Sequence, residues 1–242
     1  MSHLLVTGGA RGIGAAVVRL AVERGFVVSF TYRSDHDAAA RLVEETAGRT
    51  HAICADVGDP ALAPRVVRDA VAALGPVDAL VNNAGTTGPL GTFLERTEAE
   101  TRHVFETNVL GLVAMARAAA RAWVAEGRPG VMVNLSSTAA ASGAPGEYVE
   151  YAASKAAVEA LTRGLGRELA PAGIRVVAVA PGSTDTDIHA AAGDPGRPAR
   201  VARQIPLGRV ARPEEIAQVV LFALSPEASY LTATTITVGG GL

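Results

Sequence analysis

A tyrosine and a lysine four residues apart, Tyr151 and Lys155, are the residues of this sequence best suited to chemistry. Residues 151–168 have the pattern of a helix, and side chains four apart lie on the same helix face. A cation beside a phenol stabilises the phenolate and lowers the tyrosine pKa from about 10. A tyrosine tuned in this way can donate or accept the proton that accompanies hydride transfer. We therefore expect this pair to act on a carbonyl or an alcohol group.

The composition sets Lys155 apart from the other basic residues. The chain has 22 lysines and arginines, and Lys155 is its only lysine. An ammonium is a compact point charge with three donors, so it can bond ribose hydroxyls as well as tune a phenol. A chain that otherwise uses arginine has placed its one ammonium close to a tyrosine, which favours a functional pair over a solvent-exposed one.

Two further polar positions can complete such a site. Ser137 follows Ser136 directly after the apolar run 131–135, at the end of an expected strand, where its hydroxyl can bond a substrate oxygen beside Tyr151. Two serines after a strand also commonly form a simple turn. Asn108 falls inside an expected helix, where asparagine has a low propensity. Its presence there indicates a packing or hydrogen-bonding role.

A glycine-rich turn, TGGARGIG, occupies residues 7–14 between the first expected strand and the first expected helix. Glycines allow a tight turn and a close approach of the backbone to a pyrophosphate, and the helix N-terminus adds free N–H groups and a partial positive charge. Its position in the first strand–helix connection makes the motif a strong signal for dinucleotide binding. The expected contacts are Gly8, Gly12, Ile13 and Gly14.

The end of the second expected strand bears on the choice of nicotinamide cofactor. Sites that prefer NAD usually place an acid there for the ribose 2′-hydroxyl, but this strand ends in Arg33 and Ser34. Arg33 can pair with a 2′-phosphate, and Arg11 in the glycine turn can reach the same group. Asp35, slightly farther on, is the feature that argues against this. We expect NADP(H), with NAD(H) less favoured.

Apolar runs alternate with helical patterns along the whole chain. Strands are expected at 3–7, 27–32, 51–55, 79–82, 131–135, 176–180 and 235–238, and helices at 13–24, 37–47, 60–74, 98–126, 151–168 and 213–224. Continuous valine-rich strands are typical of parallel strands buried on both faces. This predicts one domain over 1–242, a doubly wound parallel sheet in a three-layer α/β/α Rossmann fold. The irregular segment 183–206 is predicted to be a substrate lid, with a plain surface loop as the alternative.

Composition excludes several classes of function. The net charge of −2 gives no electrostatic basis for binding nucleic acid or an anionic membrane. The sequence contains no run of 18 apolar residues, and the apolar strand begins too early for a signal peptide. Cys54 is the only cysteine, so no internal disulfide and no cysteine-based metal site is expected. A cytoplasmic enzyme with a small-molecule substrate and without a metal fits these features.

Together these motifs resemble the short-chain dehydrogenase/reductase family over almost the whole chain. Residues 7–14 match its TGxxxGxG loop, and 82–85 (NNAG) match the segment that supports the sheet and lines the cofactor. Arginines at positions 11 and 33 are typical of members that prefer NADP. The resemblance implies further dinucleotide contacts: Asp56 and Val57 at the adenine, Asn83, Ala84 and Gly85 along the cofactor, and Pro181, Gly182, Thr184 and Thr186 at the nicotinamide carboxamide.

The resemblance also implies roles for the four residues matched to the catalytic tetrad. Tyr151 would be the general acid/base, Ser137 would orient the carbonyl, Lys155 would bind the nicotinamide ribose and tune Tyr151, and Asn108 would hold a water in a proton relay. The serine usually lies thirteen positions before the tyrosine, but Ser137 is fourteen before it and Thr138 is thirteen before it. We expect Ser137 to act, with Thr138 as the alternative. A homotetramer or homodimer is implied as well.

The expected function is that of an NADPH-dependent carbonyl reductase or secondary alcohol dehydrogenase. Within the same family, a 3-oxoacyl-thioester reductase and a sugar dehydrogenase are alternatives. A catalytically silent NADP-binding regulator is the alternative from another class, although a regulator has no need of Tyr151 and Lys155. The glycine spacing and the lack of a large C-terminal substrate domain argue against an epimerase or dehydratase.

Overall fold

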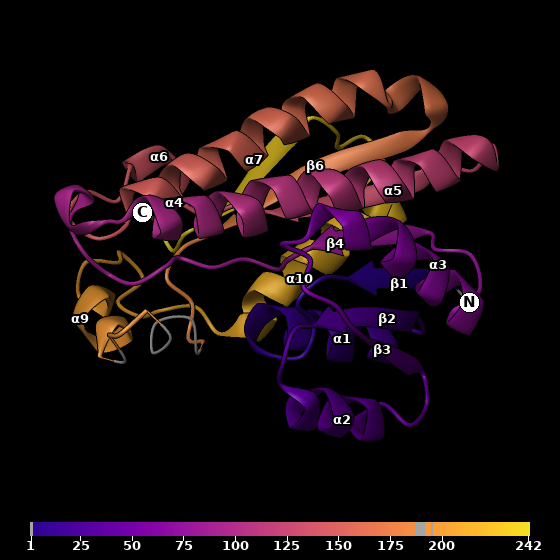
Figure 1. Ribbon diagram of the computed structural model, residues 1–242, viewed down its shortest axis with the longest axis horizontal. Coiled ribbons are helices and arrows are strands. Elements are labelled where there is room, and N and C mark those ends of the chain that lie inside the picture. Colours follow the sequence, from indigo (N-terminus) through magenta and orange to yellow (C-terminus); the bar gives the residue numbers. More distant parts are fainter. Residues whose placement is uncertain (1, 187–191, 195) are drawn as a thin grey trace.

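A computed structural model describes residues 2–186, 192–194 and 196–242. The described residues form one sheet of seven parallel strands in the order β3-β2-β1-β4-β5-β6-β7 (Figure 1). The strands are β1 His3–Val6, β2 Val27–Tyr32, β3 Thr50–Cys54, β4 Ala79–Asn82, β5 Gly130–Leu135, β6 Ile174–Pro181 and β7 Thr234–Val238. The order reverses between β1 and β4, so the predicted doubly wound Rossmann fold is confirmed.

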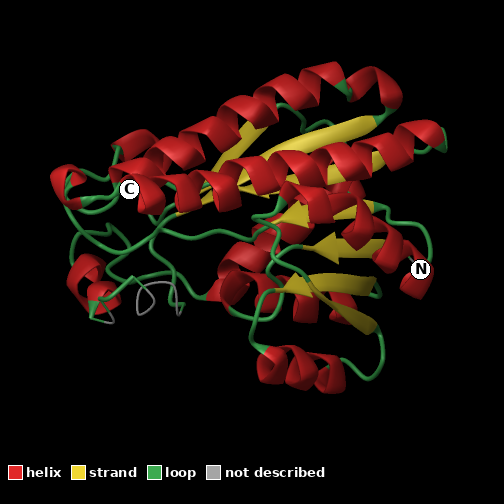
Figure 2. Cartoon of the chain, viewed as in Figure 1, coloured by secondary structure: helices red, strands yellow, loops and turns green. Residues whose placement is uncertain are grey.

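Helices cover both faces of the sheet and give the three expected layers (Figure 2). The α-helices are α1 Gly12–Glu23, α2 His36–Glu45, α3 Ala63–Leu74, α4 Glu98–Phe105, α5 Leu112–Ala125, α6 Ala139–Ser142, α7 Val149–Glu168, α9 Arg197–Ala202 and α10 Pro213–Leu224. Short 3₁₀ turns span Pro60–Leu62, Phe93–Glu95, Ala170–Ala172 and Pro226–Ala228. Helices α1, α2 and α10 lie on one face, and α3, α5 and α7 lie on the other.

Alternation within each strand explains why the strands are apolar throughout. Successive side chains of a strand point to opposite faces. In β1, Leu4 and Val6 pack into the core beneath α1 and α10, while Leu5 packs into the opposite core with Trp123 of α5. The side chains of Leu4, Leu5 and Val6 are all fully buried. A sheet covered on both faces therefore requires the continuous apolar runs that the sequence contains.

The expected single helix over 98–126 is wrong in one respect. A π-helical turn, Glu106–Gly111, separates α4 from α5. At Gly111 the helix lies so close to the preceding loop that a Cβ atom would come within 2.2 Å of the Val57 carbonyl oxygen. Wide turns of this kind insert one residue into a helix and occur frequently at functional sites. Here the turn carries Asn108.

Candidate active site

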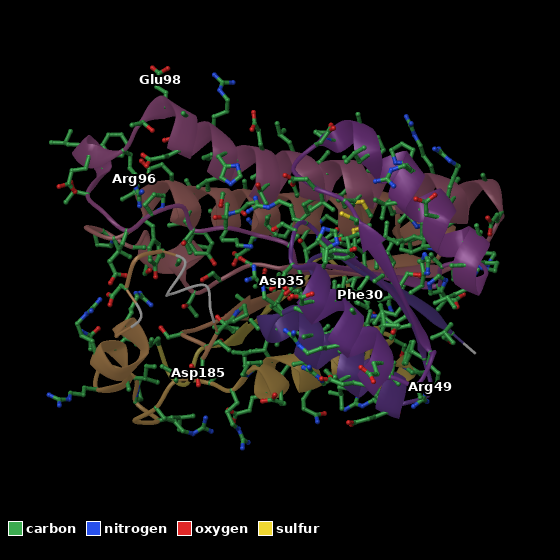
Figure 3. The ribbon with its side chains drawn as sticks, turned by 60° about the horizontal axis from the view of Figure 1, so that its bottom comes forward. Phe30, Asp35, Arg49, Arg96, Glu98 and Asp185 are labelled. Carbon is green, nitrogen blue, oxygen red and sulfur yellow. The ribbon has the colours of Figure 1, made fainter. Side chains whose placement is uncertain are left out.

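A cavity of about 730 Å³ runs along the carboxyl ends of the strands, where ligands bind in folds of this kind. Figure 3 helps to locate this edge of the sheet. Asp35 and Asp185 come after the carboxyl ends of β2 and β6, and both lie well apart from Arg49, which comes before β3. Nearly all predicted site residues line the cavity: Gly8, Arg11, Gly12, Ile13, Arg33, Ser34, Asp56, Val57, Asn83, Ala84, Gly85, Ser137, Tyr151, Lys155, Pro181, Gly182, Thr184 and Thr186. Gly14 and Asn108 do not line the cavity themselves. They contact residues that do: Gly14 packs against Gly8 and Asn83, and Asn108 bonds to Thr86.

The glycine turn is built for a close-lying phosphate group. Gly8 and Gly12 have φ values of +65° and +53°, which favour glycine. A Cβ atom on Gly14 would lie 2.2 Å from the Gly8 carbonyl oxygen, so no larger residue fits there. The Asn83 amide locks the turn by donating to the carbonyl oxygens of Gly8 at 2.9 Å and Thr7 at 3.0 Å.

Helix α1 opens directly onto this turn. Its N-cap residue, Arg11, makes no side-chain capping bond to the first turn of the helix. The backbone N–H groups of that turn are therefore available to an anion, and the helix dipole favours negative charge there. Together with the glycine turn, these residues fit the pyrophosphate of a dinucleotide.

The charges at the end of β2 are divided between two tasks. Asp35 caps α2 by accepting from the Ala38 N–H at 3.0 Å, and its other carboxylate oxygen lies 3.7 Å from Arg11 Nη1. Arg33 is exposed and forms no ion pair with any residue that the structure describes. The acid that argued against NADP thus has local partners, and a guanidinium is left available at the strand end.

The Ser137 hydroxyl is the one that meets the Tyr151 phenol. A side-chain hydrogen bond joins them, and the Ala139 N–H also donates to Ser137 Oγ at 3.2 Å. Thr138 instead packs its methyl group toward Gly239. Between Ser137 and Tyr151, α6 ends in a left-handed Gly143. The structure therefore favours Ser137 over Thr138 as the hydroxyl that orients a carbonyl.

Burial controls the ionisation of both Tyr151 and Lys155. It raises the pKa of Tyr151, while the hydrogen bond from Ser137 and the charge of Arg197 act in the opposite direction. Lys155 Nζ lies 5.6 Å from the Tyr151 ring centre and donates to the Leu135 carbonyl oxygen at 2.7 Å. The expectation that Lys155 lowers the tyrosine pKa is thus wrong for this structure, because desolvation is the larger effect. Burial thus favours the neutral phenol of Tyr151 over the phenolate.

Asn108 ties three segments together beneath the catalytic residues. Its side chain is almost fully buried. Its Oδ1 accepts from the Thr86 N–H at 2.8 Å, and its Nδ2 donates to the Thr86 carbonyl oxygen at 2.8 Å and to Ser154 Oγ at 2.9 Å. A Cβ atom on Gly85 would lie 3.2 Å from Asn108 Oδ1 and 3.4 Å from Lys155 Nζ. Asn108 therefore positions the segment over which Lys155 extends, and a water relay through it stays a prediction.

Three residues that line the cavity received no individual role from the sequence. Thr107 has a buried hydroxyl without a hydrogen-bond partner among the described residues. Glu147 and Arg197 form an ion pair at the other end of the cavity. No periodic pattern links positions 147 and 197, so this pairing could not be predicted from the sequence. The lid segment 183–206 does line the cavity through Ala192, Arg197, Val201 and Gln204, although residues 187–191 and 195 lie outside the described part.

The pKa of Lys155 leads to a pH prediction. Burial lowers this pKa to about 8. The ammonium therefore predominates below about pH 8, and above it the cationic fraction falls about tenfold per pH unit. We expect kcat/KM for NADPH to be constant near neutrality and to fall above about pH 8. A profile that stays flat to about pH 10 would contradict a role for the charged ammonium.

Metal and membrane features are absent from the described residues. They contain no group of three or more histidine, cysteine, aspartate or glutamate side chains that could hold a metal ion. No helix in the described ranges has the length and hydrophobicity needed to cross a membrane.

The fold and the crevice define an oxidoreductase that binds a nicotinamide dinucleotide. Residues 8–242 match the family model described as enoyl-(acyl carrier protein) reductase. The chain belongs to the short-chain dehydrogenase/reductase family. It is 39% identical to an uncharacterised oxidoreductase of Escherichia coli, YgfF, over 100% of both chains.

Solved structures agree closely with the fold. A 3-ketoacyl-(acyl-carrier-protein) reductase from Brucella melitensis, complexed with NADH, is 30% identical with a TM-score of 0.92 and covers 99% of this chain and 97% of its own. A short-chain dehydrogenase from Burkholderia cenocepacia, in complex with NADP, is 33% identical with a TM-score of 0.91 and the same coverage. Both reduced and oxidised nicotinamide cofactors thus occupy this fold in similar proteins.

Proposed function

We propose that this protein is an NADPH-dependent reductase that converts a small ketone or aldehyde to an alcohol, with Tyr151 as the proton donor. The observation that carries the proposal is the meeting of Tyr151, Ser137 and Lys155 on the wall of one cavity, with the Tyr151 ring centre 5.6 Å from Lys155 Nζ. A phenol kept neutral by burial suits donation to a carbonyl oxygen better than abstraction of a proton from an alcohol.

The reaction assigns a task to each residue of the chain. NADPH, when bound, supplies the hydride that the carbonyl carbon receives. Tyr151 transfers its proton to the carbonyl oxygen, and Ser137 orients that oxygen by a hydrogen bond. Lys155 would hold the nicotinamide ribose with its remaining N–H donors. The phenol is then reprotonated from solvent, so one NADPH and one proton are consumed for each alcohol formed.

The preference for NADP rests on arginines at the adenosine end of the cavity. Arg33 is exposed and without an ion pair among the described residues, and Asp35 is held by Ala38 and Arg11. A free guanidinium fits a 2′-phosphate by a charge-assisted fork. The NADP complex of the Burkholderia relative supports this choice, and the NADH complex of the Brucella relative is the counterexample.

Other assignments follow from the family and are proposed here with their support. A 3-oxoacyl thioester is an alternative substrate, because the Brucella relative is a 3-ketoacyl-carrier-protein reductase, and a sugar is another. Segment 183–206 is proposed as a substrate lid because several of its described residues, Ala192, Arg197, Val201 and Gln204 among them, line the cavity. A cytoplasmic homotetramer or homodimer is proposed, in which subunit contacts would cover Leu110, 50% exposed, and Phe222, 44% exposed.

A panel of carbonyl compounds, followed by NADPH oxidation, tests the function and separates it from a silent binder. We expect NADPH-dependent turnover with at least one neutral ketone, and formation of the corresponding alcohol in equal amount. An NADPH-binding regulator would bind the dinucleotide and oxidise none of it with any member of the panel, and this result would contradict the proposal.

A further inference from the structure

The substrate end of the cavity holds a buried cation that the proposed reaction does not use. Arg197, the first residue of α9, is only 7% exposed. Its Nη2 donates to Glu147 Oε2 at 2.5 Å, and its guanidinium carbon lies 5.2 Å from the ring centre of Tyr148. A buried charge is costly unless it is paired. Glu147 supplies the pairing, so the guanidinium stays charged inside the cavity wall.

The guanidinium keeps spare hydrogen-bonding capacity. An arginine has five N–H donors. Nη1 reaches Ser183 Oγ only at 3.4 Å, and Nε, although buried, has no hydrogen-bond partner in the described ranges. A buried donor without a hydrogen-bond partner destabilises the folded protein. Nη1 and Nη2 each carry a second N–H that bonds no described residue, so an acceptor atom that enters the cavity beside Arg197 can bond there.

Arg197 lies within reach of the reacting centre. The Tyr148 ring meets the Tyr151 ring edge-to-face with centres 5.3 Å apart. The Arg197 guanidinium carbon is 5.2 Å from the Tyr148 ring centre, which is 5.3 Å from the Tyr151 ring centre. The distance from the guanidinium carbon to the Tyr151 ring centre therefore cannot exceed the sum of these two distances. The guanidinium charge also acts on Tyr151 and opposes the rise in its pKa. One small molecule can thus contact both the phenol and the guanidinium.

The surroundings decide which acceptor fits. Glu147 already balances the charge of Arg197, and a second carboxylate would lie close to Glu147. The cavity is lined by apolar residues, among them Leu90, Ala139, Ala144, Ala192, Val201 and Leu242, and by the neutral polar residues Ser142, Ser183 and Gln204. With the charge of Arg197 already balanced by Glu147, a second buried anion there would lack a cation of its own. An uncharged acceptor needs only a hydrogen-bond donor and no second cation, so it suits the site better than a carboxylate.

We propose that Arg197 binds a second, uncharged carbonyl oxygen of the substrate, so that the preferred substrates are dicarbonyl compounds such as diketones and oxo-esters. This inference rests on the proposed reductase function. Tyr151 donates to the carbonyl that is reduced, while Arg197 holds the other one and thereby orients the molecule. Glu147 sets the charge preference by excluding oxo-acids in their carboxylate form.

The test compares four substrates with the intact enzyme and NADPH: acetylacetone, ethyl acetoacetate, acetoacetate and methyl propyl ketone. A hydrogen bond to a charged group is worth about 1.5–3 kcal/mol, or about ten- to hundredfold in kcat/KM. The wild-type protein should therefore prefer the first two substrates to the monoketone by at least about tenfold. Equal values for the ester and the monoketone would overturn the proposal.

Two variants separate recognition from a purely structural role. Arg197→Leu should lower kcat/KM for the two neutral dicarbonyls by about tenfold or more and change the monoketone by less than about threefold. Arg200→Leu, on the same helix and exposed, is the matched control and should change neither. An equal loss with all four substrates would show that Arg197 only holds α9 in place.

Glu147→Gln leaves Arg197 in position and makes its charge available. We expect kcat/KM for acetoacetate to rise relative to ethyl acetoacetate by about tenfold, while NADPH binding is unchanged. An unchanged ratio would contradict the role of Glu147 even if Arg197→Leu failed to fold. Turnover of the monoketone alone would sink the inference and leave the reductase standing. No turnover with any ketone would sink the proposed function, and the inference with it.

Discussion

Replacing Tyr151 by phenylalanine should lower kcat for ketone reduction by about 10²–10⁴-fold, the usual contribution of a positioned acid. The change removes one oxygen and keeps the ring that packs edge-to-face against Tyr148. NADPH binding, measured by titration of the cofactor fluorescence, should therefore persist within a few-fold. The loss should appear in kcat rather than in KM, because the proton is transferred only in the transition state.

A matched tyrosine elsewhere in the chain serves as the control. Tyr230 is fully exposed and lies outside the cavity, so Tyr230→Phe should retain full activity. If Tyr151→Phe kept more than about a tenth of the wild-type kcat, another group would have to donate the proton and the assignment of the acid would be wrong.

Replacing Arg33 by alanine should raise the KM for NADPH by about ten- to hundredfold and the KM for NADH by less than about threefold. The two cofactors differ only in the 2′-phosphate, and loss of one charge-assisted hydrogen bond costs about 1.5–3 kcal/mol. Arg33 is exposed on the cavity wall and makes no ion pair within the described residues, so its removal leaves no buried partner unsatisfied. Initial rates with each cofactor measure the effect.

Arg41→Ala is the control for net charge in this experiment. Arg41 lies on the exposed side of α2 and outside the cavity, so its loss changes the charge equally without removing a phosphate contact. Both KM values should stay within about twofold. Equal rises for NADPH and NADH in Arg33→Ala would contradict recognition of the 2′-phosphate by Arg33.

Local pattern was sufficient to predict the sheet and most of the dinucleotide site. Buried parallel strands need apolar side chains on both faces, and runs such as residues 176–180 satisfy that requirement visibly. The glycine turn could be predicted from the sequence because its spacing has a steric cause: only glycine fits where Gly14 meets the Gly8 carbonyl. Residues that follow strand ends then gather at one edge of the sheet, which brings Ser137 to the cavity from sequence position alone.

Features that depend on contacts between distant segments were not predictable. The π turn around Asn108 ends at Gly111, where the helix comes close to Val57, and helical periodicity in the sequence records neither feature. The rise in the Tyr151 pKa follows from burial by the surrounding fold, whereas the spacing of Tyr151 and Lys155 suggested the opposite shift. The pairing of Glu147 with Arg197 likewise joins the turn before α7 to the start of α9, two segments far apart in the sequence.

Transfer of deuterium from NADPH labelled at the transferred position is the most direct measurement of the central claim, that a hydride moves to a carbonyl carbon while Tyr151 protonates the oxygen. With the wild-type protein and a ketone of the panel, mass spectrometry should find one deuterium on the alcohol carbon for each NADPH oxidised. Tyr151→Phe, with NADPH still bound, should yield almost no labelled alcohol. Oxidation of NADPH without deuterium in the alcohol, or labelled alcohol formed equally well by Tyr151→Phe, would contradict the account.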